Sequence, residues 1–262
     1  MRLKVISCEV FRLEFETLAE KIKEHDLDFT FQPFGLHDDP DKLRLELQSQ
    51  IDSVSPGSFD YILIGYALCS RGTVGITARD IPLVFFRAHD CITVFLGSRR
   101  RYMEEFIKEP GTYYYSPGWI ERGKDVDQLA SARERIRRLK YRQYVEKYGE
   151  DNARYLIEME SSWVNNYSRA AFINMGIGDI ERYRTSVGKI AEGNGWQFEE
   201  LEGSWRLIGN FLSGEWDEDD FLIVRRGQKV VDVYNEEIMR AEKACFPSED
   251  LVSSPSDILS QR

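Results

Sequence analysis

Residues 61–66 read YILIGY, and this continuous apolar run decides the fold prediction. It lies between Asp60 and Cys69, and such a run is typical of a central parallel strand that is covered on both faces. A second run, residues 81–86 (IPLVFF), starts near a proline, which a strand tolerates at its beginning. Segments with apolar residues at helical spacing separate such runs throughout residues 1–120. This order predicts an open, mostly parallel α/β sheet.

Shorter segments continue the alternation of strands and helices. Further strands are predicted at residues 3–7, 28–34, 112–115, 170–175 and 196–201, and helices at 13–24, 43–54, 92–107, 176–191 and 205–212. Residues 125–169 are charged and are expected to be helical. Residues 221–224 and 229–233 flank the sequence RRGQ and are expected to pair as a hairpin.

We therefore predict two Rossmann-like βα halves with flanking helices. The first, residues 1–123, carries the Cys and His motifs that are described below. The second, residues 124–235, begins with a helical connector and repeats the βαβ order. After Asn235 the composition shifts to Glu, Ser, Pro and Asp, so we expect residues 236–262 to form a mobile tail.

The composition excludes several classes of protein. The chain has 262 residues with 35 Lys and Arg against 45 Asp and Glu, and its net charge of −10 argues against nucleic acid as the main partner. A hydrophobic content of 42% is that of a folded globule rather than of a disordered chain. No window approaches the ~18 to 20 apolar residues of a membrane helix, and the first residues do not resemble a signal peptide. We therefore expect a cytoplasmic protein without a membrane partner.

Three of the four cysteines follow predicted strands. Cys8, Cys69 and Cys91 each come directly after one, whereas Cys245 lies in the polar tail. Ligands of open α/β sheets bind outside the carboxyl ends of the strands, so neighbouring strands would bring these three thiols together. Three thiolates suit either zinc or an iron–sulfur cluster with one open iron, and the sequence leaves both possible. A single cysteine at a strand end is more often a small packing residue.

His89 and Asp90 stand beside one of these cysteines. Asp90 precedes an apolar helical run and is expected to be its N-cap, which places Cys91 in the first helical turn, where backbone N–H groups favour a thiolate. His89 is a candidate fourth metal ligand, a general acid or base, or a residue that orients a ligand. We assign catalytic roles to His89 and Asp90.

Two arginines and two glycines are candidates for binding a substrate. Arg71 and Arg87 flank the same predicted edge and are expected to clamp a carboxylate or phosphate, with a salt bridge to one of the many acidic residues as the alternative. Gly176 and Gly178 follow a predicted strand and resemble half of a phosphate-binding turn. They lack the third glycine and the lysine of known nucleotide motifs, so the pattern is weak.

Several motifs occur together along the chain: ISCEV at 6–10, IGYALCS at 64–70, PLV at 82–84, RAHDCIT at 87–93, LGS at 96–98, PGTYY at 110–114 and SPGW at 116–119. Over about residues 3 to 235 the chain resembles a bacterial and archaeal family that is catalogued only as a domain of unknown function. The matching positions are Cys8, Cys69, Arg87, His89, Asp90 and Cys91. Members of that family are often found in anaerobes, and some are associated with gene neighbourhoods of corrinoid-dependent methyltransferases. The resemblance thus implies a role in corrinoid methyl metabolism.

The leading hypothesis is a metal-binding α/β protein of anaerobic one-carbon metabolism, with Cys8, Cys69 and Cys91 holding zinc or an iron–sulfur cluster. Its substrate would be a small anion or a thiol, and its partner a corrinoid protein or a methyltransferase. Two alternatives stay open. One is a metal-free enzyme in which Cys91 is the nucleophile and His89 the base. The other is a non-catalytic accessory protein of a methyltransferase.

Overall fold

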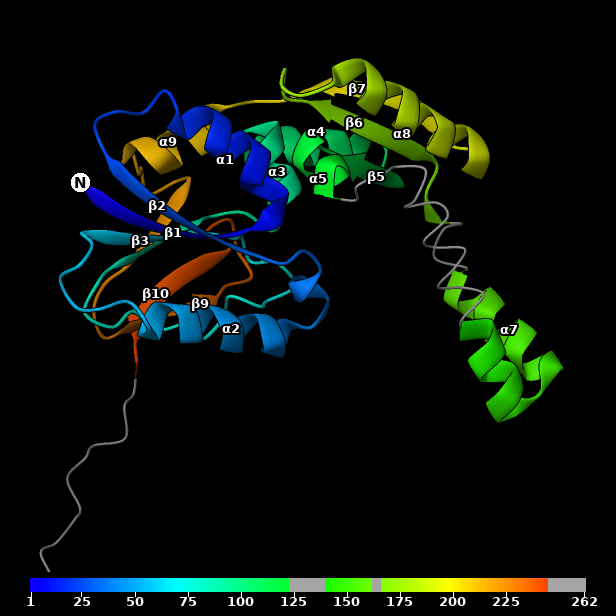
Figure 1. The fold of residues 1–262 in the computed structure, drawn as a ribbon, viewed down its shortest axis with the longest axis horizontal. Coiled ribbons are helices and arrows are strands. Elements are labelled where there is room, and N and C mark those ends of the chain that lie inside the picture. Colours follow the sequence, from blue (N-terminus) through cyan, green and yellow to red (C-terminus); the bar gives the residue numbers. More distant parts are fainter. Residues whose placement is uncertain (123–139, 162–165, 245–262) are drawn as a thin grey trace, which may run out of the picture.

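The computed structural model describes residues 1–122, 140–161 and 166–244 (Figure 1). Its larger sheet has five strands in the order β2-β1-β3-β4-β8. Their bounds are β1 (Arg2–Cys8), β2 (Asp26–Gln32), β3 (Tyr61–Gly65), β4 (Leu83–Phe86) and β8 (Phe221–Val224). The first four strands run parallel to their neighbours, and β8 pairs antiparallel with β4. The α/β prediction is confirmed.

A smaller parallel sheet has the order β5-β6-β7, and a separate antiparallel pair joins β9 to β10. The bounds are β5 (Thr112–Tyr115), β6 (Arg169–Asn174), β7 (Gln197–Glu202), β9 (Gln228–Asp232) and β10 (Met239–Lys243).

Helices flank these sheets. They are α1 (Arg12–Ala19), α2 (Pro40–Asp52), α3 (Cys91–Leu96), α4 (Arg99–Lys108), α5 (Pro117–Arg122), α7 (Glu150–Ser161), α8 (Ile180–Asn194) and α9 (Arg206–Ser213). Helix α2 covers one face of the larger sheet with Leu43, Leu47 and Ile51, which recur every four residues and are buried. Helices α1 and α9 lie on the other side of the sheet (Figure 1). No helix within the described ranges is long and apolar enough to cross a membrane.

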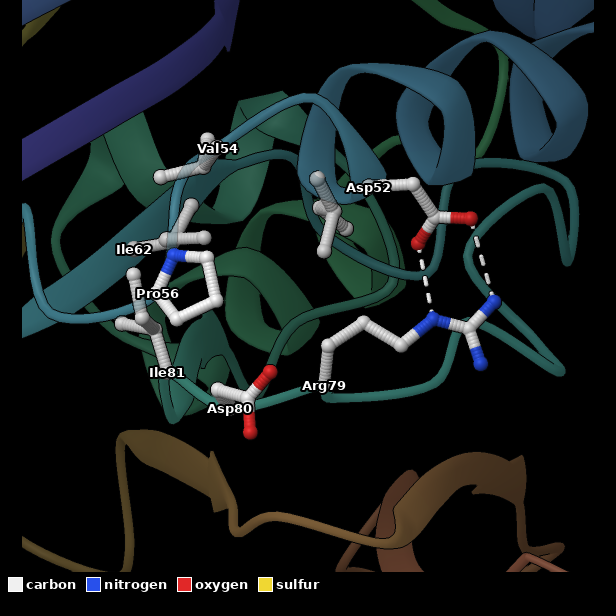
Figure 2. Close-up of a pocket in the computed structure, with 8 residues that line it drawn as sticks. Asp52, Val54, Pro56, Ile62, Arg79, Asp80 and Ile81 are labelled. Atoms are coloured by element: carbon white, nitrogen blue, oxygen red, sulfur yellow. Dashed lines mark hydrogen bonds and ion pairs between the residues drawn. The ribbon is translucent and has the colours of Figure 1, made fainter.

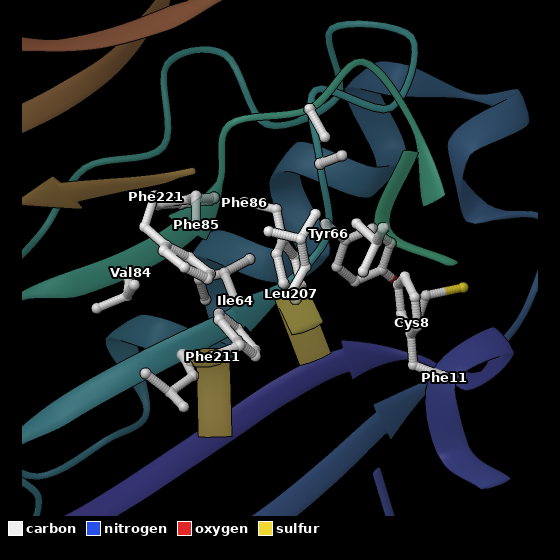
Figure 3. Close-up of a cluster of buried hydrophobic side chains, with 14 of the residues drawn as sticks. Cys8, Phe11, Ile64, Tyr66, Val84, Phe85, Phe86, Leu207, Phe211 and Phe221 are labelled. Carbon is white, nitrogen blue, oxygen red and sulfur yellow. The ribbon is translucent and has the colours of Figure 1, made fainter. Parts of the chain in front are cut away.

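The main hydrophobic core joins the two sheets, and a second cluster between the smaller sheet and α8 includes Phe172, Tyr183 and Val187. Ile173, Met175 and Leu201 from the smaller sheet belong to the same buried cluster as the strands of the larger one. Aromatic residues fill its centre (Figure 3), where the rings of Phe86 and Phe211 stack with centroids 4.1 Å apart. Burial of each such side chain stabilises the fold by about 1.5 to 3 kcal/mol. The loops at the strand ends therefore extend from a densely packed core.

The division into halves at residue 123 does not coincide with the sheets. Strand β5 lies in the first predicted half but pairs with β6 of the second. Strand β8 lies in the second predicted half but completes the larger sheet of the first. Each predicted half therefore contributes one strand to the sheet of the other half. Of the predicted helical connector, residues 140–148 and α7 are helical and meet at Gly149. Residues 166–168 are not α-helical and Arg169 begins β6, whereas residues 125–139 and 162–165 lie outside the described residues.

Three further predictions are wrong in detail. The predicted helix over 92–107 is two helices, because Gly97 adopts φ +82° and ends α3 before α4 begins. The predicted hairpin of 221–224 with 229–233 does not form, since β8 pairs with β4 and β9 pairs with β10. Residues 236–244 are part of the folded body rather than of a tail, because Ile238 and Met239 are buried. The remainder of the predicted tail, with Cys245, lies outside the described residues.

Candidate functional site

The three cysteines lie at the carboxyl ends of three adjacent strands. Cys8 is the last residue of β1, Cys69 follows β3 and Cys91 follows β4. Because the strand order places β3 between β1 and β4, all three loops emerge at the same edge of the larger sheet. The condition that the sequence prediction required, that these strands are neighbours, is therefore met.

Close backbone contacts hold the three loops together. The N–H of Leu68 donates to the carbonyl of Ala88 at 2.9 Å, and the N–H of Cys69 donates to that of His89 at 3.0 Å. At the junction of β1 and β3, a Cβ on Gly65 would overlap the side chain of Ser7. Glycine is therefore required for the strands to approach each other at the point where the site begins.

The loop after β3 has an unusual backbone. Cys69, Ser70 and Arg71 have φ values of +44°, +55° and +67°, three successive non-glycine residues in the left-handed region. Each such residue costs about 1 to 2 kcal/mol. The N–H of Gly72 donates to the carbonyl of Cys69 at 2.9 Å and helps to hold the turn. The sequence did not predict this feature, because Cys69, Ser70 and Arg71 are not residue types that favour a left-handed turn. Backbone strain of this kind often marks a functional loop.

The three thiols interact electrostatically. Burial raises the pKa of Cys69 and of Cys91, and Cys8 raises both of them further. Asp90 and Cys69 also raise the pKa of Cys91. Cys8 is 6% exposed, and its sulfur is directed away from the aromatic core in Figure 3. Both pKa shifts are opposite to the thiolate stabilisation that we expected for Cys91, because desolvation outweighs the favourable backbone contact in the first turn of α3.

Two tyrosines and Asp90 surround the thiols. The pKa of Tyr66 is raised by burial and then by Cys8 and Cys69, so its hydroxyl lies beside those sulfurs. The predicted N-cap role of Asp90 is confirmed, since its carboxylate accepts from the N–H of Thr93 at 3.1 Å. Burial raises the pKa of Asp90, and burial followed by the charge of Asp90 raises that of Tyr102. His89 is exposed, and its charge opposes the shift of Asp90.

The two arginines carry other contacts in this structure. Arg71 forms an ion pair of 3.0 Å with Asp232, the alternative that the sequence left open. Arg87 donates to the carbonyl oxygens of Phe221 and Glu237 at 3.1 Å and to that of Met239. Both guanidinium groups are thus occupied by the chain itself.

Gly176 and Gly178 lie in the loop between β6 and α8, at the carboxyl end of a strand in the smaller sheet, with φ values of +71° and +74°. A Cβ on Gly178 would overlap the Tyr183 side chain, whereas a Cβ on Gly176 would meet nothing. The structure puts this loop after β6 of the smaller sheet, whereas the three cysteines follow strands of the larger sheet. It therefore places the two glycines in a different sheet from the thiols.

A metal ion has no ready set of ligands in the described part of the chain. Within residues 1–122, 140–161 and 166–244, no group of three or more His, Cys, Asp and Glu side chains is positioned to hold one. A cavity of about 260 Å³ lies elsewhere, at the opposite edge of the larger sheet near Ile62 and Ile81 (Figure 2). Its rim carries the pair of Asp52 and Arg79, joined by bonds of 2.8 and 3.1 Å. Since the carboxylate of Asp52 is already paired, this cavity does not compete with the cysteine edge as the candidate site.

One buried acid near this edge was missed by the sequence analysis. Glu14 of α1 is fully buried, accepts from the N–H of Gly118 at 3.3 Å, and its Oε2 makes no hydrogen bond within the described chain. Burial raises its pKa from 4.5 to about 7. The helical pattern of residues 13–24 places Glu14 on the apolar face next to Phe15, and that position is the signal that could have revealed it.

Comparison with known proteins yields one family. A family model described as "Protein of unknown function (DUF1638)" matches residues 31–212, which is more than half of the chain. The matched range includes Cys69, His89 and Cys91 but begins after Cys8. No curated protein and no solved structure matches.

Proposed function

Since the chain belongs to the DUF1638 family, whose description assigns no activity, we propose a function from the site itself: Cys8, Cys69 and Cys91 bind a thiophilic metal centre, either zinc or an iron–sulfur cluster. The observation that supports this proposal is the arrangement of three mutually interacting thiols at adjacent strand ends, with Cys8 buried and Cys69 and Cys91 half-buried. Disulfide bonds do not explain the cluster, because all three residues are thiols.

The electrostatics of the cluster favour a cation. Burial, the neighbouring thiols and Asp90 all disfavour a thiolate at Cys91. A bound cation reverses these effects, because metal binding releases the thiol protons and the metal charge compensates the thiolates. Three protein sulfurs satisfy three positions of a tetrahedral zinc or three irons of a four-iron cluster and leave one position for a substrate. No preformed ligand set is present among the described residues, so we expect the cysteine side chains to rotate toward the metal when it binds.

Neighbouring residues have supporting roles in this proposal. Asp90 caps α3 and orients the segment that carries Cys91. His89, which is exposed beside it, serves as a fourth ligand or as the acid or base toward a small anionic or thiol substrate. We place this activity in cytoplasmic one-carbon metabolism, with a corrinoid protein or methyltransferase as partner. That context rests on the family resemblance of the motifs alone.

Metal analysis of anaerobically purified protein tests the proposal. We expect about one zinc ion, or one iron–sulfur cluster with visible absorbance, per chain. Cys69→Ala should lose more than about nine tenths of this metal, because two thiols bind far more weakly than three. Cys245→Ala changes the fourth cysteine and is the matched control, which should keep the wild-type content. Metal-free wild-type protein, or equal metal in both variants, would contradict the proposal.

The metal-free alternative predicts a different chemistry. A catalytic Cys91 thiolate should alkylate with iodoacetamide near neutral pH much faster than the other thiols. The raised pKa of Cys91 predicts slow alkylation instead. Rapid modification of Cys91 alone, in protein without metal, would favour the nucleophile. Stable co-purification with a methyltransferase, without metal or turnover, would favour an accessory protein.

A further inference from the structure

Three arginines converge on one short turn of the chain. This turn joins β9 to β10 and comprises residues 233–237 (VYNEE). Arg71 donates to the hydroxyl of Tyr234 at 2.7 Å, and Arg87 donates to the carbonyl of Glu237 at 3.1 Å. Arg99 donates to the carbonyl of Glu236. Asp232, which ends β9, pairs with Arg71. These contacts bring together guanidinium groups from three different loops and helices.

The turn is held by its own hydrogen bonds as well as by these arginines: the N–H of Val233 donates to the carbonyl of Ile238 at 2.9 Å, and the N–H of Glu237 donates to the side chain of Asn235 at 2.9 Å. Tyr234 is 93% exposed, and residues 235–237 are exposed as well. Ile238, which follows the turn, adopts φ +64°, a strained conformation for a β-branched residue. Ile238 and Met239 themselves are buried and anchor the end of the turn. The arginine contacts therefore hold an exposed segment next to a strained residue.

Two of the acceptors in the turn are uncharged. Arg87 and Arg99 donate to backbone carbonyl oxygens of the turn, whereas the planar guanidinium fork can bind both oxygens of a carboxylate or phosphate at once. Arg87 and Arg99 donate to the carbonyls of two adjacent residues, Glu237 and Glu236, so these two positive groups lie close together. Both acceptor residues carry acidic side chains. The acidic turn thus partly neutralises a concentrated positive charge.

We propose that Arg71, Arg87 and Arg99 form an oxyanion-binding site that the 233–237 turn occupies, and that a small molecule with carboxylate or phosphate groups binds there by displacing the turn. Arg87 stays anchored during this exchange by its bonds to Phe221 and Met239. The acids of the turn, Glu236 and Glu237, move away with it.

The location connects this site to the cysteines. Arg71 follows Cys69 by two residues in the left-handed loop, and Arg87 precedes Cys91 by four. Hydrogen bonds from Leu68 to Ala88 and from Cys69 to His89 tie these two loops. As a statement about the substrate, the inference rests on the proposed function. As a statement about anion binding, it stands on the arginine contacts alone.

Titration of metal-free protein with inorganic phosphate and with succinate tests the site, and amide hydrogen exchange of residues 233–237 tests the displacement. We expect one of the two anions to bind and to speed exchange in the turn. Asp232→Asn removes the carboxylate that pairs with Arg71. Because Asp232 then no longer competes with the added anion for this guanidinium group, the anion should bind about fivefold more tightly. Tyr234→Phe, at an exposed position, should tighten binding by about twofold through loss of one hydrogen bond.

Two controls separate the outcomes. Asp80→Asn breaks the pair with Arg226, at 3.1 Å, and should leave anion binding unchanged. Arg71→Gln in the Asp232→Asn background should remove the gain. Failure of both anions to bind wild-type protein and Asp232→Asn, or binding with unchanged exchange of 233–237, would overturn the inference. Anion binding that persists in Cys69→Ala separates this result from failure of the metal proposal.

Discussion

Glu14 shows at the scale of one residue how packing changes chemistry. Its carboxyl lies between α1 and α5, where Gly118 approaches so closely that a Cβ there would overlap the carbonyl oxygen of Val10. Desolvation raises the pKa of Glu14, and the backbone N–H groups of Glu14 itself and of Gly118 lower it by less. The carboxyl is therefore stabilised in its neutral form.

The raised pKa predicts a pH dependence of stability. The folded protein binds the Glu14 proton more tightly than the unfolded chain, so this residue's contribution to the free energy of unfolding falls as pH rises from 4.5 to about 7. The loss is up to about 3 kcal/mol and is complete above pH 7. Urea unfolding should therefore show Glu14→Gln gaining stability relative to wild type across this range. Glu16 is exposed on the same helix, and the free energy of unfolding of Glu16→Gln should change with pH in parallel with that of the wild type. Parallel curves for Glu14→Gln as well would contradict the pKa shift.

Glycine separates two helices that the sequence pattern joins. Between α3 and α4, Gly97 has φ +82°, and its carbonyl accepts from Arg206 of α9 at 2.7 and 3.0 Å. A Cβ at this position would overlap the side chain of Ser204. The break turns α4 to lie against the smaller sheet, where Glu105 pairs with the buried Arg169 at 3.0 Å.

Gly97→Ala should therefore destabilise the fold. A left-handed alanine costs about 1 to 2 kcal/mol, and overlap with Ser204 adds about 1 to 3 kcal/mol. Gly188→Ala, inside α8 with open space around the new methyl group, is the matched control and should be neutral or stabilising by up to about 1 kcal/mol. Thermal unfolding of both variants measures the difference. Equal melting temperatures of the two variants would show that the stability of the fold does not depend on a glycine in the left-handed conformation at position 97.

The whole molecule is joined by strands that cross between its parts. Strand β8 reaches back to β4, and the β9–β10 pair contacts residues 75–78, with the N–H of Gly75 donating to Val230 at 2.8 Å and that of Val230 donating to Ile76 at 2.9 Å. These contacts link the last described strands to the loop that follows Cys69. Strands β9 and β10 thus support the candidate site.

Two truncations test this long-range support. A chain that ends at Asn235 lacks β10 and the buried side chains of Ile238 and Met239, whereas a chain that ends at Ala244 keeps them. We expect the shorter chain to be less stable than the longer one by at least about 4 kcal/mol, since loss of each buried side chain costs about 2 to 5 kcal/mol. Urea unfolding of the two proteins measures this difference. Equal midpoints would mean that β10 is dispensable.

The sequence predicted what depends on neighbouring residues. The apolar run at 61–66 identified β3, helical spacing identified α1 and α2, and Asp90 was recognised as an N-cap from the residues that follow it. Strand ends also placed three cysteines together, because parallel strands end at one edge of a sheet. Boundaries and breaks were harder, since Gly97 ends a helix only through its φ and through contact with Ser204.

Amino-acid order alone thus determined the α/β class and the cysteine edge, since both follow from hydrophobic periodicity and chain direction. Tertiary structure decided the rest. It paired β8 with β4, matched Arg71 with Asp232 across 161 residues, and desolvated Glu14, Cys69 and Cys91 enough to raise their pKa values. The physical reason is that partner choice and desolvation depend on which distant segments pack together, and no local pattern encodes those distances.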